Sequence, residues 1–334
     1  MAYVPDVNMS GMRCTVFRSV DLMATCGATR GRGLGTVEHH VPGDCFAIAR
    51  DATPRALRLQ RDRTGRLFVL PNTEIGRVGE ELYLDSIVTL MAGPNAMAEV
   101  LVLSSTCSAN RTAETYLLPL SPLLRATDYH LVSTNQQDTD ERLLQAAFLP
   151  LMQGTLVTLE DGSVAKAETL KRGDRVLTRD HGAQPLLWSS VCTQRVAGGN
   201  APIRIEAGAL GNSNDLSVLP DQRLLVYQRR DDIGIGRPEL LVKARSLVNG
   251  TTVTQDHIGF FDVVHLGFDV PAVIFAEGVA TELVALTEPN APANHSEAIV
   301  HEAVVFGAGS ALDASEALAT RKDALSVLQK ASHG

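Results

Sequence analysis

Aromatic side chains are scarce in this chain: they make up 4% of its 334 residues and include a single tryptophan. Carbohydrate sites commonly stack aromatic rings on the apolar faces of sugars, and a chain with few rings offers few such platforms. A small-ligand or carbohydrate-binding module is therefore the last of the three functional hypotheses that the sequence supports.

Clustered positive charge is also lacking. The net charge is −8, and the acidic and basic residues are interspersed. Nucleic-acid binding depends on grouped Lys and Arg side chains that displace phosphate counterions, so we expect no nucleic-acid partner. No apolar run approaches the roughly 18–20 residues of a membrane span, which predicts no membrane span.

The beginning of the chain lacks the basic-then-apolar order of a secretory signal peptide. It contains Pro5, Asp6 and Asn8 instead. The sequence therefore leaves the compartment unknown. The cytoplasm is the default expectation, with leaderless export or association with a particle as alternatives.

Cysteine is infrequent and follows no recurring spacing. The number is odd and none stands in a Cys-x-x-Cys motif, the five being Cys14, Cys26, Cys45, Cys107 and Cys192. These features favour reduced structural thiols over a set of disulfides. No cofactor is predicted.

Short β-type runs separated by turn signals fill the first half of the chain. The clearest lie at 57–61, 66–70, 87–91 and 99–103. Strands at this spacing predict a β-sandwich or barrel-like domain. We place this β-rich N-terminal domain at 38–140, after an N-terminal extension at 1–37.

The second half predicts another β-rich domain, followed by a helix. A polar stretch at 136–141 is the expected linker, and Asp-Gly and Asn-Gly pairs in the following region favour tight hairpins. At 308–331, an apolar stripe at helical spacing predicts a C-terminal α-helix, which packs either on its own domain or on a partner. The overall fold class is thus mostly β.

Two segments of the first half resemble binding motifs only superficially. The glycine-rich stretch Gly31–Thr36 lacks the Gly-Lys-Ser/Thr ending of a phosphate-binding loop, so we expect a flexible loop there. His39 and His40 precede Asp44 and Cys45, but neighbouring histidines on a strand point to opposite faces. No metal site is predicted.

The most specific pattern begins at Gly154-Thr155. It continues to Gly162, which follows an aspartate, and then to Gly173-Asp174 ahead of 175–178, with sequence Arg-Val-Leu-Thr. These glycines and Asp174 are expected to define turns. The ordered blocks resemble the opening of a Hint (Hedgehog/intein) domain, and the likeness continues through 203–210, 224–230, 242–250 and 274–278.

The resemblance implies a Hint-like β horseshoe at 148–288, in a bacterial protein of the alphaproteobacterial type. An active Hint domain cleaves its own backbone through an acyl shift. It needs a Cys or Ser as its first residue and a Thr-x-x-His element that protonates the departing nitrogen.

In this chain the positions that correspond to the catalytic residues have changed. Pro150 stands at the nucleophile position, and Leu219 and Gln222 stand at the Thr and His positions. Glutamine can hydrogen-bond an amide but cannot deliver a proton near neutral pH. His265 is expected to be a core histidine. The resemblance therefore implies a scaffold with no catalytic residue.

The leading hypothesis is a non-catalytic structural or interaction protein built on a degenerate Hint domain. It would be a component of a larger assembly, such as a surface structure or a phage-like particle, with protein partners or self-association. The alternative is residual autoproteolytic processing at the junction 147–154 of an exported protein.

Overall fold

The computed structural model describes residues 12–62, 64–93, 96–105, 113–121, 123–196, 201–227, 239–257, 259–268, 272–283, 298–299, 304–305 and 312–313. The fold is mostly β, as the sequence predicts. The chain divides into two compact units, Met1–Ala147 with Ala285–Gly307 and Phe148–Val284 with Ala308–Gly334. Each unit is described by itself.

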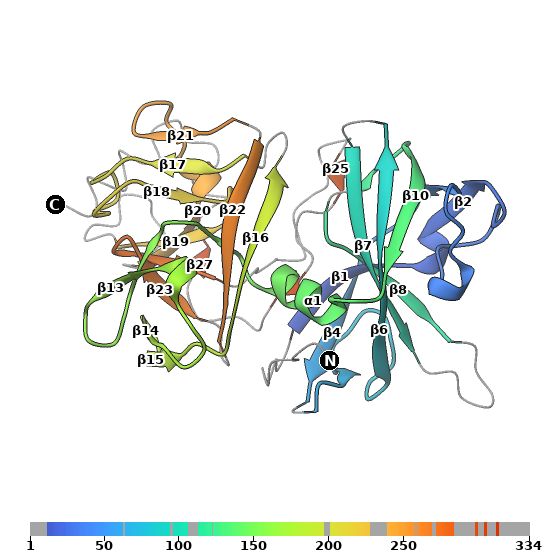
Figure 1. The fold of residues 1–334 in the computed structure, drawn as a ribbon, viewed down its shortest axis with the longest axis horizontal. Helices are drawn as coiled ribbons and strands as arrows, with labels where there is room; N and C mark the ends of the chain where they lie inside the picture. The colour runs from blue at the N-terminus through green and yellow to red at the C-terminus, as the bar shows by residue number, and fades with distance from the viewer. Residues whose placement is uncertain are drawn as a thin grey trace. The chain divides into compact units, whose positions relative to one another are not determined.

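The first unit contains the large sheet A (Figure 1). Its strands are β1 (Met12–Arg18), β2 (Leu22–Cys26), β3 (Cys45–Ile48), β4 (Arg55–Arg61), β5 (Leu67–Val69), β6 (Glu81–Ala92), β7 (Ala96–Ser105), β8 (Thr115–Pro119), β10 (Asp128–Asn135) and β26 (Val304–Val305). A separate pair joins β9 (Leu123–Leu124) to β25 (Ala298–Ile299). Short 3-10 turns lie at Ser19–Asp21 and Val37–His39.

Six strands of sheet A close into a β-barrel. They follow one another in the order β6, β5, β4, β1, β8 and β7, and β7 pairs again with β6. The sequence leaves a sandwich and a barrel as alternatives. The closed ring of hydrogen-bonded strands shows that this part of the unit is a barrel. Closure removes the exposed sheet edges that an open sheet would leave.

Strand β1 is part of this barrel although the sequence places it in an N-terminal extension. It pairs with β4 through Met12↔Leu59 and with β8 through Phe17↔Leu117. All four side chains are buried. The local pattern of residues 12–18 does not reveal these partners because they lie about 40 and 100 residues further along the chain.

A helix, α1 (Thr139–Ala147), ends the first of the two segments that form this unit. The predicted linker at 136–141 therefore overlaps the first turn of this helix. The negative charges of Asp140 and Glu141 in that turn interact favourably with the positive end of the helix dipole. Leu143, Leu144 and Ala147 are buried on its inner side.

One sequence expectation about the cysteines is wrong. Cys26 of β2 and Cys45 of β3 form a disulfide with a Cα–Cα distance of 4.9 Å. The strand register places these two residues opposite each other, and this pairing cannot be seen from their separation of 19 residues. Cys14 and Cys192 are not in disulfides, and Cys107 lies outside the described residues.

The second unit has three sheets. One contains β11 (Leu151–Met152), β22 (Gly259–Gly267) and β16 (Trp188–Val196), and another contains β18 (Leu216–Val218), β17 (Ile203–Ile205) and β21 (Val253–Gln255). The largest contains β12 (Leu156–Thr158), β13 (Val164–Lys166), β14 (Arg175–Thr178), β15 (Gly182–Pro185), β19 (Arg223–Tyr227), β20 (Glu239–Lys243), β23 (Val273–Ala276), β24 (Val279–Glu282) and β27 (Leu312–Asp313). Short 3-10 turns lie at Ala167–Thr169 and Ala244–Leu247.

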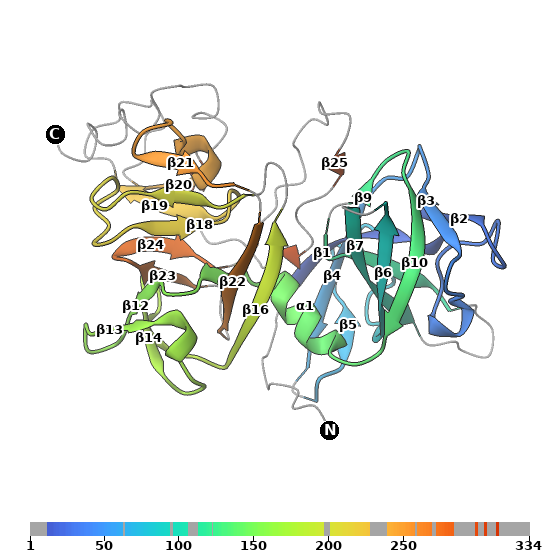
Figure 2. The same cartoon turned by 45° about the horizontal axis from the view of Figure 1, so that its top comes forward.

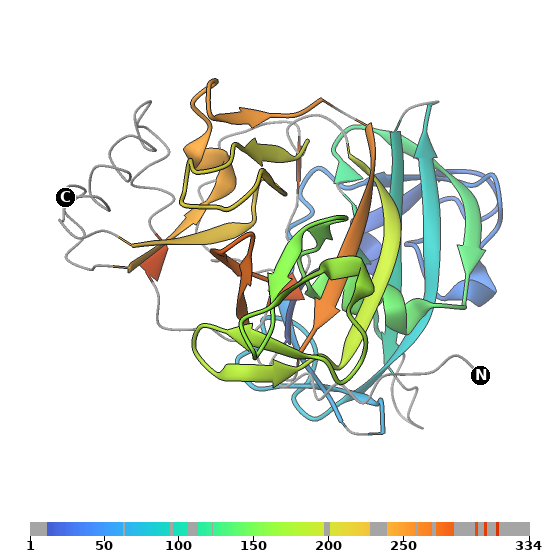
Figure 3. The ribbon, with the colours of Figure 1, turned by 60° about the vertical axis from the view of Figure 1, so that its left-hand side comes forward.

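The strands of the largest sheet lie one above another in Figure 2, and Figure 3 shows β16 and β22 side by side along their whole length. One apolar cluster fills the core of the unit and includes Val157, Leu224, Val264 and Ile274.

The tight turns of the second unit need glycine at two of the predicted positions in particular. Gly162 has φ +82° and Gly173 has φ +96°, in the left-handed region that favours glycine. The Asp174 carboxylate accepts a hydrogen bond from the Lys171 N–H at 2.8 Å and so closes the second turn. Gly154, also at positive φ, donates its N–H to Glu168 at 2.9 Å.

The predicted C-terminal helix is not confirmed. Within 308–331 the structure describes only Leu312–Asp313, which form β27 and pair in parallel with β20. The rest of that prediction lies outside the described residues.

Candidate functional site

Pro150, which the sequence analysis places at the nucleophile position of the Hint pattern, is buried. Pro150 immediately precedes β11, whose residues Leu151 and Met152 pair with Val264 and Val263 of β22. On the other side, the Leu149 N–H donates to the Leu283 carbonyl at 2.7 Å. The junction is therefore held on both sides by backbone pairing.

Gln222, which the sequence analysis places at the position of the general acid, lies in the turn between β18 and β19. Its N–H donates to the Leu219 carbonyl at 3.0 Å, so Leu219 and Gln222 open and close the same turn. The Gln222 side chain is fully buried. Its Nε2 donates to the Glu282 carbonyl at 3.4 Å, and among the described residues its Oε1 has no hydrogen-bond partner.

The structure brings these positions together through one short segment at the end of β24. Leu149, which precedes Pro150, binds the carbonyl of Leu283, and Gln222 binds the carbonyl of Glu282. Residues more than 70 positions apart in sequence thus contact two consecutive peptide units. Both contacts are hydrogen bonds from an N–H group to a backbone carbonyl.

Glu282, whose carbonyl accepts the hydrogen bond from Gln222, also forms a buried ion pair through its carboxylate. Arg223 Nε lies 2.8 Å from Glu282 Oε2, with 7% and 8% of the two side chains exposed. Sequence reasoning missed this pair, because its partners are 59 residues apart. The only local signal is a charged residue in each of two otherwise apolar strands.

His265 is a core histidine, as the sequence analysis expects, and 1% of its surface is exposed. It lies on β22 with its ring centroid 6.2 Å from that of Trp188, and its Nδ1 is 4.0 Å from Cys192 Sγ. The ring centroid of Phe148 also lies 6.2 Å from that of Trp188. Phe148 stands two residues before Pro150 in the chain, so the aromatic group includes a residue next to the junction.

No metal site of the usual ligands is visible in the part of the chain that the structure describes: no three His, Cys, Asp or Glu side chains converge. The four residues that the sequence analysis considers have other roles. Cys45 is in the disulfide, and Asp44 accepts hydrogen bonds from Ala28 and Thr29. His40 contacts Thr134 and the Gly35 carbonyl, and His39 Nδ1 lies 3.3 Å from the Thr36 hydroxyl.

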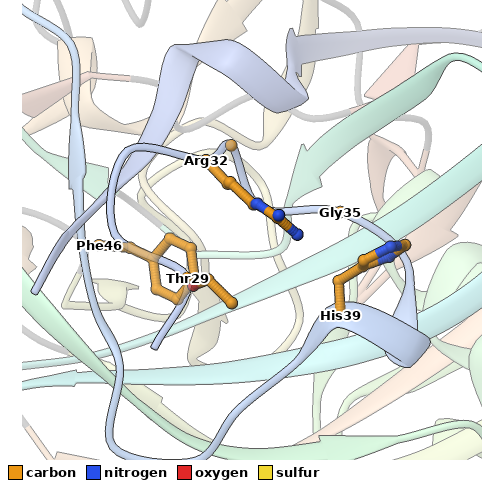
Figure 4. A pocket seen from close by; sticks show the side chains of 6 residues that line it. Thr29, Arg32, Gly35, His39 and Phe46 are labelled. Carbon is orange, nitrogen blue, oxygen red and sulfur yellow. The ribbon is translucent and has the colours of Figure 1, made fainter. Parts of the chain in front are cut away.

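A cavity of about 220 Å³ lies at the glycine-rich stretch of the first unit. It is lined by Thr29, Arg32, Gly33, Gly35, His39 and Phe46. In Figure 4 the Arg32 guanidinium extends toward the side of the cavity where His39 lies. No described residue forms an ion pair with Arg32. A Cβ at Gly33 would lie 2.3 Å from the Ser19 carbonyl oxygen, which explains why this wall needs glycine.

These features define a β-rich protein whose second unit has tight glycine turns at Gly162 and Gly173. Residues 149–288 match the model of the Hint domain family, so this chain carries a Hint domain. No curated protein and no solved structure matches the chain. Among the described residues, no helix is long and apolar enough to cross a membrane.

Proposed function

We propose that this protein is a non-catalytic interaction protein in which the Hint domain serves as a scaffold within a larger assembly, such as a surface structure or a phage-like particle. The observation that carries the proposal is Pro150. A buried proline stands where a self-cleaving Hint domain needs a thiol or hydroxyl, and backbone hydrogen bonds hold the junction on both sides.

The relative size of the catalytic contributions supports the loss of activity. General acid–base assistance is worth about 10²–10⁴ in rate, so the change at Gln222 alone would leave a slow enzyme. Loss of the nucleophile removes the covalent route itself. The turn glycines Gly162 and Gly173 of the Hint pattern are present. This favours a structural role of the domain over a catalytic one.

Intact mass measurement of the full chain tests the loss of self-cleavage. After prolonged incubation with dithiothreitol, we expect a single species at the full 35.8 kDa. A fragment that ends at Leu149 would overturn the proposal and support residual processing at 147–154. The variant Pro150→Cys/Leu219→Thr/Gln222→His tests whether the scaffold still supports cleavage. Its matched control, Pro150→Ala with the same two other changes, lacks the nucleophile and is expected to stay intact.

The assembly role is tested separately. Size-exclusion chromatography with light scattering gives the oligomeric state, and a pull-down from the native host identifies partners. Self-association or a specific protein partner is the expected result. A strict monomer that retains no partner would contradict the assembly role and leave the loss of catalysis unaffected.

A second candidate function is the binding of a small organic anion in the cavity of the first unit. It is supported by the Arg32 guanidinium, by His39 and by the apolar ring of Phe46, which together suit a carboxylate or phosphate attached to a small apolar body. NMR titration with benzoate and with phenyl phosphate tests it. Arg32→Gln should abolish the shifts. Arg30→Gln, an exposed change in the same loop that does not line the cavity, should retain them.

A further inference from the structure

Sulfur and imidazole side chains form a continuous row across sheet A. The register pairs Cys26 with Cys45, Cys45 with His130, His130 with Met91, and Met91 with Met97. The row crosses β2, β3, β10, β6 and β7, which are neighbours in the sheet. Residues directly opposite each other on paired strands have Cβ atoms about 4.5–5.5 Å apart and share one face.

The methionine end of this row is exposed. The exposed fractions are 36% for Met91 and 51% for Met97, and His130 is also exposed. Their neighbours along the strands, Leu90 and Ala98, are buried in the core. Because side chains alternate along a strand, the two thioethers and the imidazole lie together on the outer face of the sheet.

The disulfide orients His130. Its Nδ1 lies 3.3 Å from Cys45 Sγ. A sulfur in a disulfide carries no hydrogen and can only accept, so Nδ1 carries the proton in this contact. The lone pair of the neutral ring is then on Nε2, which is the atom that can bind a metal ion. This contact favours the tautomer in which Nε2 can bind a metal ion, as second-shell partners do at metal sites.

We propose that Met91, Met97 and His130 form a binding site for Cu(I), with the two Sδ atoms and Nε2 as ligands. Thioether and imidazole ligands suit soft cations, and the absence of a carboxylate from these three side chains disfavours Mg²⁺ and Ca²⁺. Methionine has three rotatable side-chain bonds, so both sulfurs can turn toward an ion between strands β10, β6 and β7. This site is independent of the Hint domain.

Ag(I) is a suitable probe because it has the same preference for soft ligands and needs no reductant, so the disulfide stays intact. The full chain is labelled with 13C at its seven methionine methyl groups. Accessible thiols are first blocked with N-ethylmaleimide, and Ag(I) is added as nitrate in chloride-free buffer. We expect the methyl signals of Met91 and Met97 to shift together and to saturate at one equivalent.

Three variants separate the site from unspecific binding. Met97→Leu and His130→Gln should each weaken Ag(I) binding by at least about tenfold, since even loss of outer-shell partners costs 10–100-fold in metal affinity. Met23→Leu is the matched control: Met23 is a partly exposed methionine on β2 of the same sheet, and its loss should leave the affinity unchanged. The other methyl signals report whether each variant is folded.

The outcomes divide cleanly. Joint, saturable shifts of Met91 and Met97 that depend on His130 support the site. Absence of shifts at both methyl groups would overturn it and leave the pair as exposed apolar side chains. A shift of one methionine alone, or equal weakening by Met23→Leu, would also overturn it, because the ion would then bind without the three ligands acting together.

Discussion

A buried cation in the first unit allows a sharp test of how this structure is stabilised. The Arg61 side chain is 1% exposed and forms an ion pair with Asp140, in the first turn of α1. Among the described residues, its Nε and Nη1 have no hydrogen-bond partner. Asp140 is therefore the group that neutralises this charge, and Asp140→Asn would leave the guanidinium buried and unpaired.

The expected cost of Asp140→Asn follows from burial. Breaking a fully buried ion pair by removal of one partner costs about 3–5 kcal/mol. Because 37% of the Asp140 side chain is exposed, solvent screening lowers this to about 2 kcal/mol. Loss of a negative charge at the start of α1 adds about 0.5 kcal/mol. Arg61→Met removes the buried charge and retains an unbranched stem, so its effect should stay within about 1 kcal/mol.

Urea denaturation at pH 7 measures these free energies of unfolding, and the single tryptophan assigns them to a unit. Trp188 lies in the second unit, so its fluorescence reports that unit, whereas far-UV circular dichroism reports both. We expect Asp140→Asn to shift the circular dichroism transition and to leave the fluorescence transition in place. The matched control Glu160→Gln breaks an ion pair in which both side chains are about half exposed, and should change stability by less than about 1 kcal/mol.

The double variant Arg61→Met/Asp140→Asn completes the cycle. If the unpaired guanidinium causes the loss, the double variant should be more stable than Asp140→Asn alone. The reasoning is refuted if Arg61→Met destabilises the unit as much as Asp140→Asn does. The ion pair would then stabilise the fold by itself, and Asp140 would do more than compensate the buried charge of Arg61.

Three further predictions concern thiols, a carboxylate and a glycine. Burial raises the pKa of the Cys14 thiol, so Cys14 should resist iodoacetamide in the native protein and react in urea, while peptide mapping should recover Cys26 linked to Cys45; rapid native labelling of Cys14 would contradict this. Hydrogen bonds from the Thr64 hydroxyl and from the backbone N–H groups of Arg66 and Thr64 lower the pKa of Asp62 to about 2. The stability that this carboxylate contributes is present above pH 3.8 and is lost as the pH falls toward 2. In an NMR titration, Thr64→Val should move the pKa of Asp62 up toward 3.8. An unchanged pKa of Asp62 would exclude the Thr64 hydroxyl as the main cause. Gly33→Ala should lower the free energy of unfolding by about 1–3 kcal/mol, because the new Cβ meets the Ser19 carbonyl. The control Gly35→Ala should be tolerated, since the nearest atom to its Cβ is 3.6 Å away. Equal thermal unfolding temperatures for the two variants would contradict the clash at Gly33.

The Hint half shows where sequence reasoning is strong. The turns at Gly162 and Gly173 can be predicted without a structure, because a positive φ is a local requirement that glycine meets best. The absence of a nucleophile at Pro150 is equally local, since chemistry depends on which atoms a side chain carries. That Leu149 and Gln222 contact one segment at Glu282–Leu283 could not be predicted.

The sequence by itself determined the β-rich class, the Hint pattern and the residue types at its junction. The tertiary structure decided the closure of the barrel, the Cys26–Cys45 disulfide, the buried pair of Arg223 and Glu282, and the row that ends at Met97. These features share one physical cause. Each depends on the register between strands that are distant in sequence, and register is set by hydrogen bonding and core packing across the whole sheet, which no local pattern encodes.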